Sequence, residues 1–405
     1  MSFREQFEIP AKYKMWSLIL MAVGLVSILV GYFMYGAGDD HQNARFWGVL
    51  LYNSVFFLLV VNASMFFITA TTMAMGGWQM SFRRVAEAIS VAVIPIGIIS
   101  AVILLALVLG HKHHIYHWLT PGDDKILLGK AGFLNPTFFI VWTALTLIGW
   151  IFLGAKMRSL SKETDANGPY TAEEGKKYIF KNTIWASLYL VWFGLTVAST
   201  VPWLWFMSID AHWYSTMYSW YTFASSFVAG MALITLFVIY LKNQGYLELV
   251  NQEHLHDLGK FMFAFSVFWT YLWFSQFMLI WYANIPEETV YFKHRVQGPY
   301  RGIFFLNLIV NFLAPLLILM RRSSKRNYTL LVFMSVLIIF GHWIDFYQMV
   351  IGSVSKEHVE LNLFDFGVAA GFVGVIMWTA GNALTKSSLI AKNHPFFKES
   401  IIHHT

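Results

Sequence analysis

The chain has 405 residues, of which 57% are hydrophobic and only 12% are charged, and its formal net charge is +6. Soluble globular proteins carry about 25% charged residues, so this composition excludes a soluble enzyme. The high apolar content also excludes an intrinsically disordered chain, and together these facts predict a polytopic helical membrane protein.

Ten segments are long and apolar enough to cross the hydrocarbon core of a bilayer, which takes about 20 residues of helix. In chain order, the predicted spans are 15–36, 46–74, 85–110, 136–154, 183–207, 215–241, 261–283, 303–320, 328–349 and 366–385. The predicted fold class is therefore an all-α polytopic membrane protein with ten transmembrane helices.

The ten spans are predicted to form two four-helix bundles, spans 2–5 and spans 6–9, with spans 1 and 10 at the periphery. The corresponding regions are 1–45, 46–207, 208–349 and 350–405. The charged loop 155–182 is predicted to be a solvated linker and a candidate boundary between two halves. Gly367 and Gly371 in span 10 have the spacing of a close-packing face, within this chain or toward a partner.

The direction of the spans follows from the distribution of Lys and Arg. With ten spans, both termini lie on one side, and 20 of the 28 Lys and Arg residues fall in segments on that side. The positive-inside rule then predicts that both termini are cytoplasmic. Because topology accounts for the positive charge, we expect no nucleic-acid partner.

Several kinds of chemistry are excluded by missing residues. The chain has no Cys, which excludes disulfides, thiolate zinc sites, cysteine-ligated iron–sulfur clusters and c-type haem attachment. No phosphate-binding glycine loop occurs. A buried b-type haem usually needs facing His ligands, and only His342 lies well inside a span. We therefore expect no redox cofactor and no metal on this chain, so any redox centres lie on partner subunits.

Ionisable residues inside spans are costly and indicate function by default. His342 and Asp345 in span 9 are three residues apart and share a helix face, which Ser335 and Met349 extend. Polar stripes at the same depth are predicted on span 7 (Tyr271, Ser275 and Tyr282, with Gln276 beside them) and on span 6 (Ser215, Ser219, Thr222 and Ser226). This arrangement predicts a protonatable pocket or a proton exit near the outer face. The alternative is an Asp–His hydrogen bond that only holds the helices in register.

Two further groups carry candidate residues. Glu87 enters span 3 at its cytoplasmic end, close after Arg83 and Arg84, so either an ion pair or the inner end of a proton path is predicted. His111, His113, His114 and His117 form a cluster that resembles a metal site. Because histidines at the membrane edge are well solvated and no Cys accompanies them, a pH-sensitive or partner-facing loop is the favoured interpretation.

Three stretches, taken in order with the ten-span plan, resemble the NrfD/PsrC-like membrane subunits, in particular the ActF-type subunit of alternative complex III. They are Arg83-Arg84-Val85-Ala86-Glu87; His114-Ile115-Tyr116-His117-Trp118 followed by Asp124, Lys130 and Leu134-Asn135-Pro136; and Phe268-Trp269 through Ser275-Gln276-Phe277 and Ile280-Trp281-Tyr282 to Asn284-Ile285-Pro286-Glu287-Glu288. The resemblance covers essentially the whole chain.

The resemblance implies a subunit of a respiratory quinol-oxidising complex in a bacterial inner membrane. Such a complex looks like a module that passes electrons to cytochrome c or to an oxygen reductase through partner subunits. The implied partners are a multihaem cytochrome c, an iron–sulfur subunit and a homologous NrfD-like subunit, with a terminal oxidase as a further candidate. Menaquinol or another quinol would bind at the level of the complex.

This sequence departs from that family in one respect. The resemblance implies a quinol pocket in the first bundle with His and Asp as proton acceptors, but here His342 and Asp345 lie in the second bundle. This favours a scaffold that is not catalytic alone, with a proton path from Glu87 inside toward Asp345 outside.

Two other functions stay open. One is a proton-coupled secondary transporter that uses Asp345 and His342. Transporters usually have interrupted spans at their binding sites, and Pro95 and Pro315 are candidates for such interruptions, although no charged residue lies beside either. The other is an NrfD-type quinone-binding anchor of a molybdoenzyme.

Overall fold

The computed structural model describes residues 4–356 and 358–404, and every regular element in these ranges is helical. The spans are formed by α1 (Ala11–Gly31), α2 (Asp40–Met73), α3 (Arg83–Ser90) continued by α4 (Val93–Leu109), α6 (Pro136–Asn167), α7 (Ala172–Leu195) continued by α8 (Val201–Trp205), α9 (Met217–Asn243), α10 (Gln252–Ala283), α12 (Arg301–Leu308) continued by α13 (Ala314–Leu319), α14 (Tyr328–Val354) and α15 (Leu363–Leu384). Three short helices lie outside them: α5 (Lys125–Gly129), α11 (Pro286–Val296) and α16 (Phe397–Ile401).

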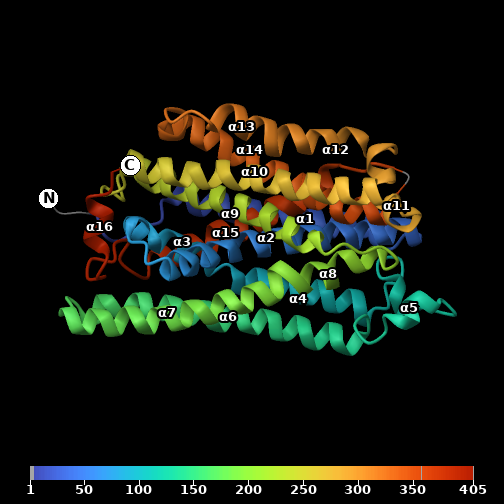
Figure 1. Cartoon of the computed structure of the whole chain (residues 1–405), viewed down its shortest axis with the longest axis horizontal. Coiled ribbons are helices and arrows are strands. Elements are labelled where there is room, and N and C mark those ends of the chain that lie inside the picture. The colour runs from blue at the N-terminus through green and yellow to red at the C-terminus, as the bar shows by residue number, and fades with distance from the viewer. Residues whose placement is uncertain (1–3, 357, 405) are drawn as a thin grey trace.

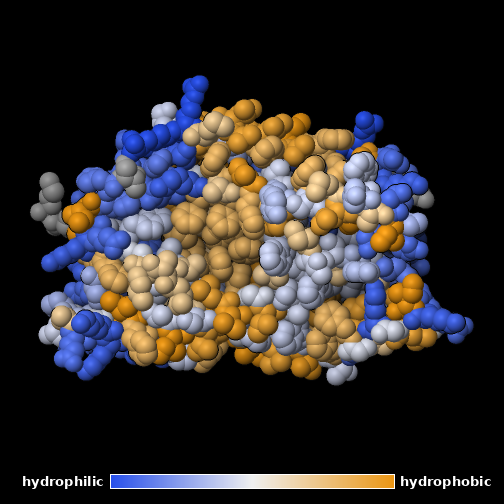
Figure 2. All heavy atoms as spheres, in the orientation of Figure 1, coloured by the Kyte–Doolittle hydropathy of each residue, from blue (hydrophilic) through white to orange (hydrophobic). Residues whose placement is uncertain are grey.

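Ten of these helices or helix pairs are long and apolar enough to cross a membrane, which confirms the predicted number of spans within the described ranges. They run roughly side by side along the long axis of the molecule (Figure 1). Figure 2 shows hydrophobic side chains across the middle of the surface and hydrophilic ones gathered at both ends. The chain is therefore a multi-pass membrane protein.

The two ends of the bundle have different contents. Both ends of the described chain lie at the end that carries α16, which we call the terminal end (Figure 1). The short helices α5 and α11 lie at the opposite end, which we call the distal end. Because α14 begins at the terminal end, its later residues lie in the distal half of the bundle.

The loop predicted at 155–182 is mostly helical, so this prediction is wrong. Helix α6 continues to Asn167, and only residues 168–171 separate it from α7. Thr171 caps α7 through a reciprocal pair of hydrogen bonds with Glu174, and Lys181 pairs with Glu163 across the two helices at 2.9 Å. Charged residues lower the hydropathy and so end the predicted span. They do not end the helix, because Lys, Arg and Glu are good helix formers.

Helices α2 and α9 lie at the centre of the fold. Helix α2 contacts α4 and α7 of the first predicted bundle and also α9 and α14 of the second. Helix α1 is peripheral and packs on α15, where a Cβ built on Gly24 would lie only 2.3 Å from the Gly371 Cα. The close-packing face of span 10 is thus used within the chain. The bundle boundaries stay a prediction, because α2 joins the two groups broadly.

Candidate functional site

Asp345 on α14 is the most deeply buried carboxylate without a charged partner. Its exposed fraction is 1%. The Tyr221 hydroxyl donates to Oδ1, while Ser225 Oγ and Trp269 Nε1 donate to Oδ2 at 2.9 and 3.0 Å. Within the described ranges, no ion pair reaches this carboxylate. Three uncharged donors from α9 and α10 therefore stabilise a group whose ionised form is costly to bury.

His342 lies one turn before Asp345 and is fully buried. Its Nδ1 lies 2.9 Å from Ser225 Oγ, and its ring meets the Trp269 ring edge-on with centroids 5.4 Å apart. Its Nε2 has no hydrogen-bond partner in the part of the chain that the structure describes. His342 and Asp345 share a face as predicted, but the contact between them runs through Ser225.

The Ser225 hydroxyl carries a single proton and can accept others, so it can connect the two groups. When it donates to Asp345, the His342 Nδ1–H can donate to its oxygen. When it donates to His342, a protonated Asp345 can donate to its oxygen. A pair that holds one exchangeable proton therefore has two states, carboxylate with imidazolium or carboxylic acid with neutral imidazole, and Ser225 links them.

A small cavity of about 10 Å³ lies beside Asp345, which is room for about one water molecule. Gln276, Gln348 and Arg295 line it, and the side-chain Nε2 atoms of both glutamines are buried without a partner among the described residues. Such unpaired donors suit a bound water. The cavity extends the polar site from Asp345 toward the distal end.

Arg295 on α11 was not singled out by the sequence, where it is one more cation of an outer loop. It is buried and donates to the Tyr291 and Gln348 carbonyls at 2.9 and 3.1 Å and to Ser353 Oγ at 2.9 Å. Its guanidinium also covers the Tyr291 ring at 3.5 Å. Burial raises the pKa of Tyr291 to about 12, although Arg295 opposes the rise. Tyr291 is therefore a neutral wall of the cavity.

Three predicted residues of span 7 do not join this site. Tyr271 and Tyr282 are 62% and 83% exposed on the outer surface of α10, and Ser275 is half-buried beside them. Helix α10 turns Trp269 and Gln276 inward instead. Tyr282 lies at the end of α10, where tyrosines favour the interface with lipid headgroups.

The stripe predicted on span 6 is also displaced. Ser219, Thr222 and Ser226 are buried, but their hydroxyls donate to backbone carbonyls. Helix α9 presents Tyr221 and Ser225 to Asp345 instead. These two are four residues apart and so share a face, a spacing that the sequence contains but that nothing in the chain marks as functional.

The predicted ion pair at Glu87 is present. Arg83 Nε lies 2.9 Å from Glu87 Oε1, and Arg84 Nε lies 3.7 Å from Oε2. Arg84 also pairs with Asp165 on α6 at 2.9 Å. These contacts join α3 to α6 at the terminal end, whereas those of Asp345 join α9, α10 and α14. The proton path from Glu87 to Asp345 therefore stays a prediction.

Two uncharged polar pairs connect spans at the centre of the first predicted bundle. The Tyr189 hydroxyl donates to Asn62 Oδ1 at 2.6 Å, and Trp150 Nε1 donates to Thr196 Oγ1 at 3.0 Å. Neither pair contains a group that titrates near neutral pH. Their role is to connect spans by hydrogen bonds.

Part of the histidine cluster meets an acidic residue at the distal end. Side-chain ligand atoms of Asp40, His113 and His114 lie within 4.8 Å of one another, and His114 Nδ1 is 3.6 Å from Asp40 Oδ1. His111 and His117 are not in this group. Desolvation lowers the pKa of His114, with the neighbouring His113 adding to the effect. The donor set suits a borderline metal ion, but two of the three residues are exposed.

No protein-family model matches the chain, and no curated protein matches it. The resemblance to NrfD/PsrC-like subunits therefore stays a prediction from the sequence, and the site has to be interpreted from its own geometry.

Proposed function

We propose that the chain is an integral membrane subunit of a respiratory quinol-oxidising complex of the alternative complex III type. The redox centres would lie on partner subunits: a multihaem cytochrome c, an iron–sulfur protein and a homologous NrfD-like subunit, with a terminal oxidase as a further candidate. The absence of Cys, and the presence of only one His well inside a predicted span, support redox centres on partner subunits. The Lys and Arg distribution supports a terminal end in the cytoplasm, and the bacterial inner membrane is what the resemblance implies.

The observation that carries this proposal is the buried cluster of Asp345, Ser225 and His342. Oxidation of a quinol to a quinone releases two electrons and two protons, and the electrons would pass to the partner subunits. The protons need acceptors in a low-dielectric region and a way out. A carboxylate bridged to an imidazole would supply the acceptors, and the one-water cavity beside it would be the first step of a way out. The chain would act as a scaffold and proton path, and not as a catalyst alone.

A proton-coupled transporter is the second candidate, and the helix geometry disfavours it. Transporter sites usually lie at interrupted helices. Here the π-helical turns Thr196–Thr200 and Ile309–Leu313 interrupt two spans, but the cluster lies on α9, α10 and α14, which are continuous. A molybdoenzyme anchor would share the same site and differs only in its partner subunits.

The decisive variant is Asp345→Asn in the complex purified with its partners. Asn is nearly isosteric but cannot take up a proton, so we expect the quinol-dependent electron-transfer rate to fall by about tenfold or more. Electron transfer and proton release would be measured together. Unchanged rates and an unchanged number of protons per electron would contradict the proton role.

A matched serine pair provides the control. Ser225→Ala removes the bridge between Asp345 and His342 and should lower the rate. Ser226→Ala removes a hydroxyl that donates to the Phe223 carbonyl of the same helix at 3.0 Å, so it should leave the rate unchanged. Isolation of the chain without multihaem or iron–sulfur subunits after mild solubilisation would contradict the assignment to a respiratory complex.

A further inference from the structure

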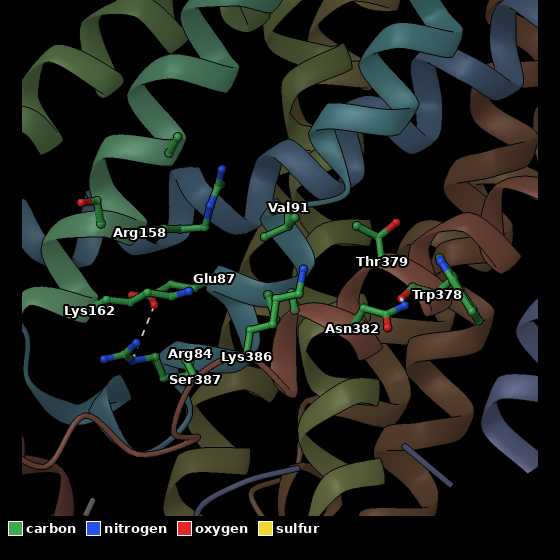
Figure 3. A pocket seen from close by; sticks show the side chains of 14 residues that line it. Arg84, Glu87, Val91, Arg158, Lys162, Trp378, Thr379, Asn382, Lys386 and Ser387 are labelled. Atoms are coloured by element: carbon green, nitrogen blue, oxygen red, sulfur yellow. Dashed lines mark hydrogen bonds and ion pairs between the residues drawn. The ribbon is translucent and has the colours of Figure 1, made fainter. Parts of the chain in front are cut away.

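A wide cleft of about 720 Å³ opens at the terminal end between α3, α6 and α15. Figure 3 shows that its walls come from helices far apart in the sequence, with Arg84 and Glu87 on α3, Arg158 and Lys162 on α6, and Lys386 just after α15. It is distant in sequence and in contacts from the Asp345 cluster. The proposed redox role does not use its cations.

The lining of this cleft has an excess of positive charge. Four cations and one carboxylate, Glu87, line it. Glu87 is paired with Arg83 and Arg84, and Arg84 also pairs with Asp165, so the excess charge comes from the other three cations. Arg158 donates to Ser90 Oγ at 3.0 Å, an uncharged partner. Among the described residues, neither Lys162 nor Lys386 has an ion pair, and both are exposed. The side chains of these lysines reach into the cleft from opposite walls (Figure 3). The site is therefore prepared for an anion that the chain itself does not supply.

The position of the cleft along the helices indicates where that anion comes from. Helix α6 has 32 residues, which at about 1.5 Å per residue exceeds a hydrocarbon core of about 30 Å. Its last two turns, with Lys162, therefore lie at the membrane boundary. Trp378 in the opposite wall lies under the Lys14 ammonium at 5.8 Å, and Trp is typical of that boundary. Deeper in, Val91 and Ala155 make the wall apolar.

We propose that this cleft binds an anionic phospholipid, with its phosphate held by Arg158, Lys162 and Lys386 and its acyl chains against the apolar wall. Basic pockets between transmembrane helices on the cytoplasmic side are suited to such headgroups, and guanidinium and ammonium groups are the usual donors to phosphate. The lipid would contact both α6 and α15 and so stabilise the packing of these helices at the terminal end. Its phosphate chemistry is shared with free phosphate, but the apolar wall favours the lipid.

The test compares two double variants of the purified full chain with its co-purifying subunits, delipidated in neutral detergent. Lys162→Gln with Lys386→Gln removes the unpaired cations of the cleft. Lys176→Gln with Lys177→Gln removes two exposed lysines of α7 that do not line it. Thermal midpoints would be measured with added phosphatidylglycerol, phosphatidylcholine or inorganic phosphate.

We expect phosphatidylglycerol to raise the midpoint of the natural chain and of the α7 variant by about 3 °C or more. The cleft variant should show less than half of that shift, and phosphatidylcholine and inorganic phosphate should have no effect. Native mass spectrometry should show an anionic lipid retained by the natural chain and lost from the cleft variant. An equal shift in both variants, or the same shift with inorganic phosphate, would overturn the proposal.

Discussion

Two aspartates on neighbouring spans are equally buried but differently partnered. Asp365 at the start of α15 forms an ion pair with Arg45 and accepts a hydrogen bond from the Tyr52 hydroxyl at 2.8 Å. Asp345 on α14 has three uncharged donors and, within the described ranges, no ion pair. Burial alone therefore does not mark a functional carboxylate. A fixed cation makes Asp365 a structural link, whereas the proposed role of Asp345 requires its carboxylate to change protonation.

Breaking the ion pair should have the largest effect on stability. Asp365→Asn removes the more buried of the two carboxylates that pair with Arg45 and leaves only the partly exposed Glu360, 3.1 Å from the Arg45 Nε. Removal of one member of a buried pair costs about 3–5 kcal/mol, and because Glu360 remains we expect a loss near the lower end, about 3 kcal/mol. Asp345→Asn leaves no charge behind and keeps the shape of the side chain, so its cost should be about 1 kcal/mol. The measurement is the unfolding free energy of both variants in the same detergent. Equal losses would remove the distinction between the two aspartates.

The sequence predicts well the spans on which these two aspartates lie. The length and hydropathy of the spans depend only on local composition, so the sequence alone locates all ten. Asp345 and His342 were found because charge inside a span is rare. Asp365 lies at the start of span 10, but its partner Arg45 lies 320 residues away, and no local pattern connects the two.

The hydrogen-bond partners of Asp345 could not be predicted from the sequence either, because they lie far from it along the chain. Ser225 and Trp269 are ordinary residues on their own helices, and only the packing of α9 and α10 against α14 turns them toward the carboxylate. Period-3.6 stripes indicate which residues share a face but not which face is inward. The prediction for α10 therefore selected Tyr271 and Tyr282, which face outward.

The hydrogen bond from the Trp269 indole to Asp345 can show whether the carboxylate is ionised. Trp269 and Trp150 are both buried, and each donates one hydrogen bond at 3.0 Å, to Asp345 and to the neutral Thr196 respectively. A bond to an ionised group contributes about 1.5–3 kcal/mol and a neutral bond about 1 kcal/mol. If Asp345 is ionised in the resting protein, Trp269→Phe should cost clearly more unfolding free energy than Trp150→Phe.

Equal costs for the two tryptophan variants would indicate a protonated Asp345. Repeating both measurements as the pH is lowered should bring the two costs together, because a carboxylate that takes up a proton loses its stronger hydrogen bonds. A difference that persists unchanged down to pH 4 would contradict a titrating Asp345 and place it with Asp365 as a structural group.

His394 at the terminal end also makes the unfolding free energy depend on pH, and this contribution must be separated from that of Asp345. Burial, with Arg83 and Arg84 close by, lowers the pKa of His394 to about 3, well below the value near 6.5 of an unfolded chain. Between these values the unfolded state binds the extra proton, so stability is full above about pH 6.5 and falls on acidification, by at most about 1.4 kcal/mol per pH unit. His394→Gln should flatten this slope in thermal unfolding between pH 7.5 and 5. An unchanged slope in His394→Gln would show that other groups cause the acid sensitivity.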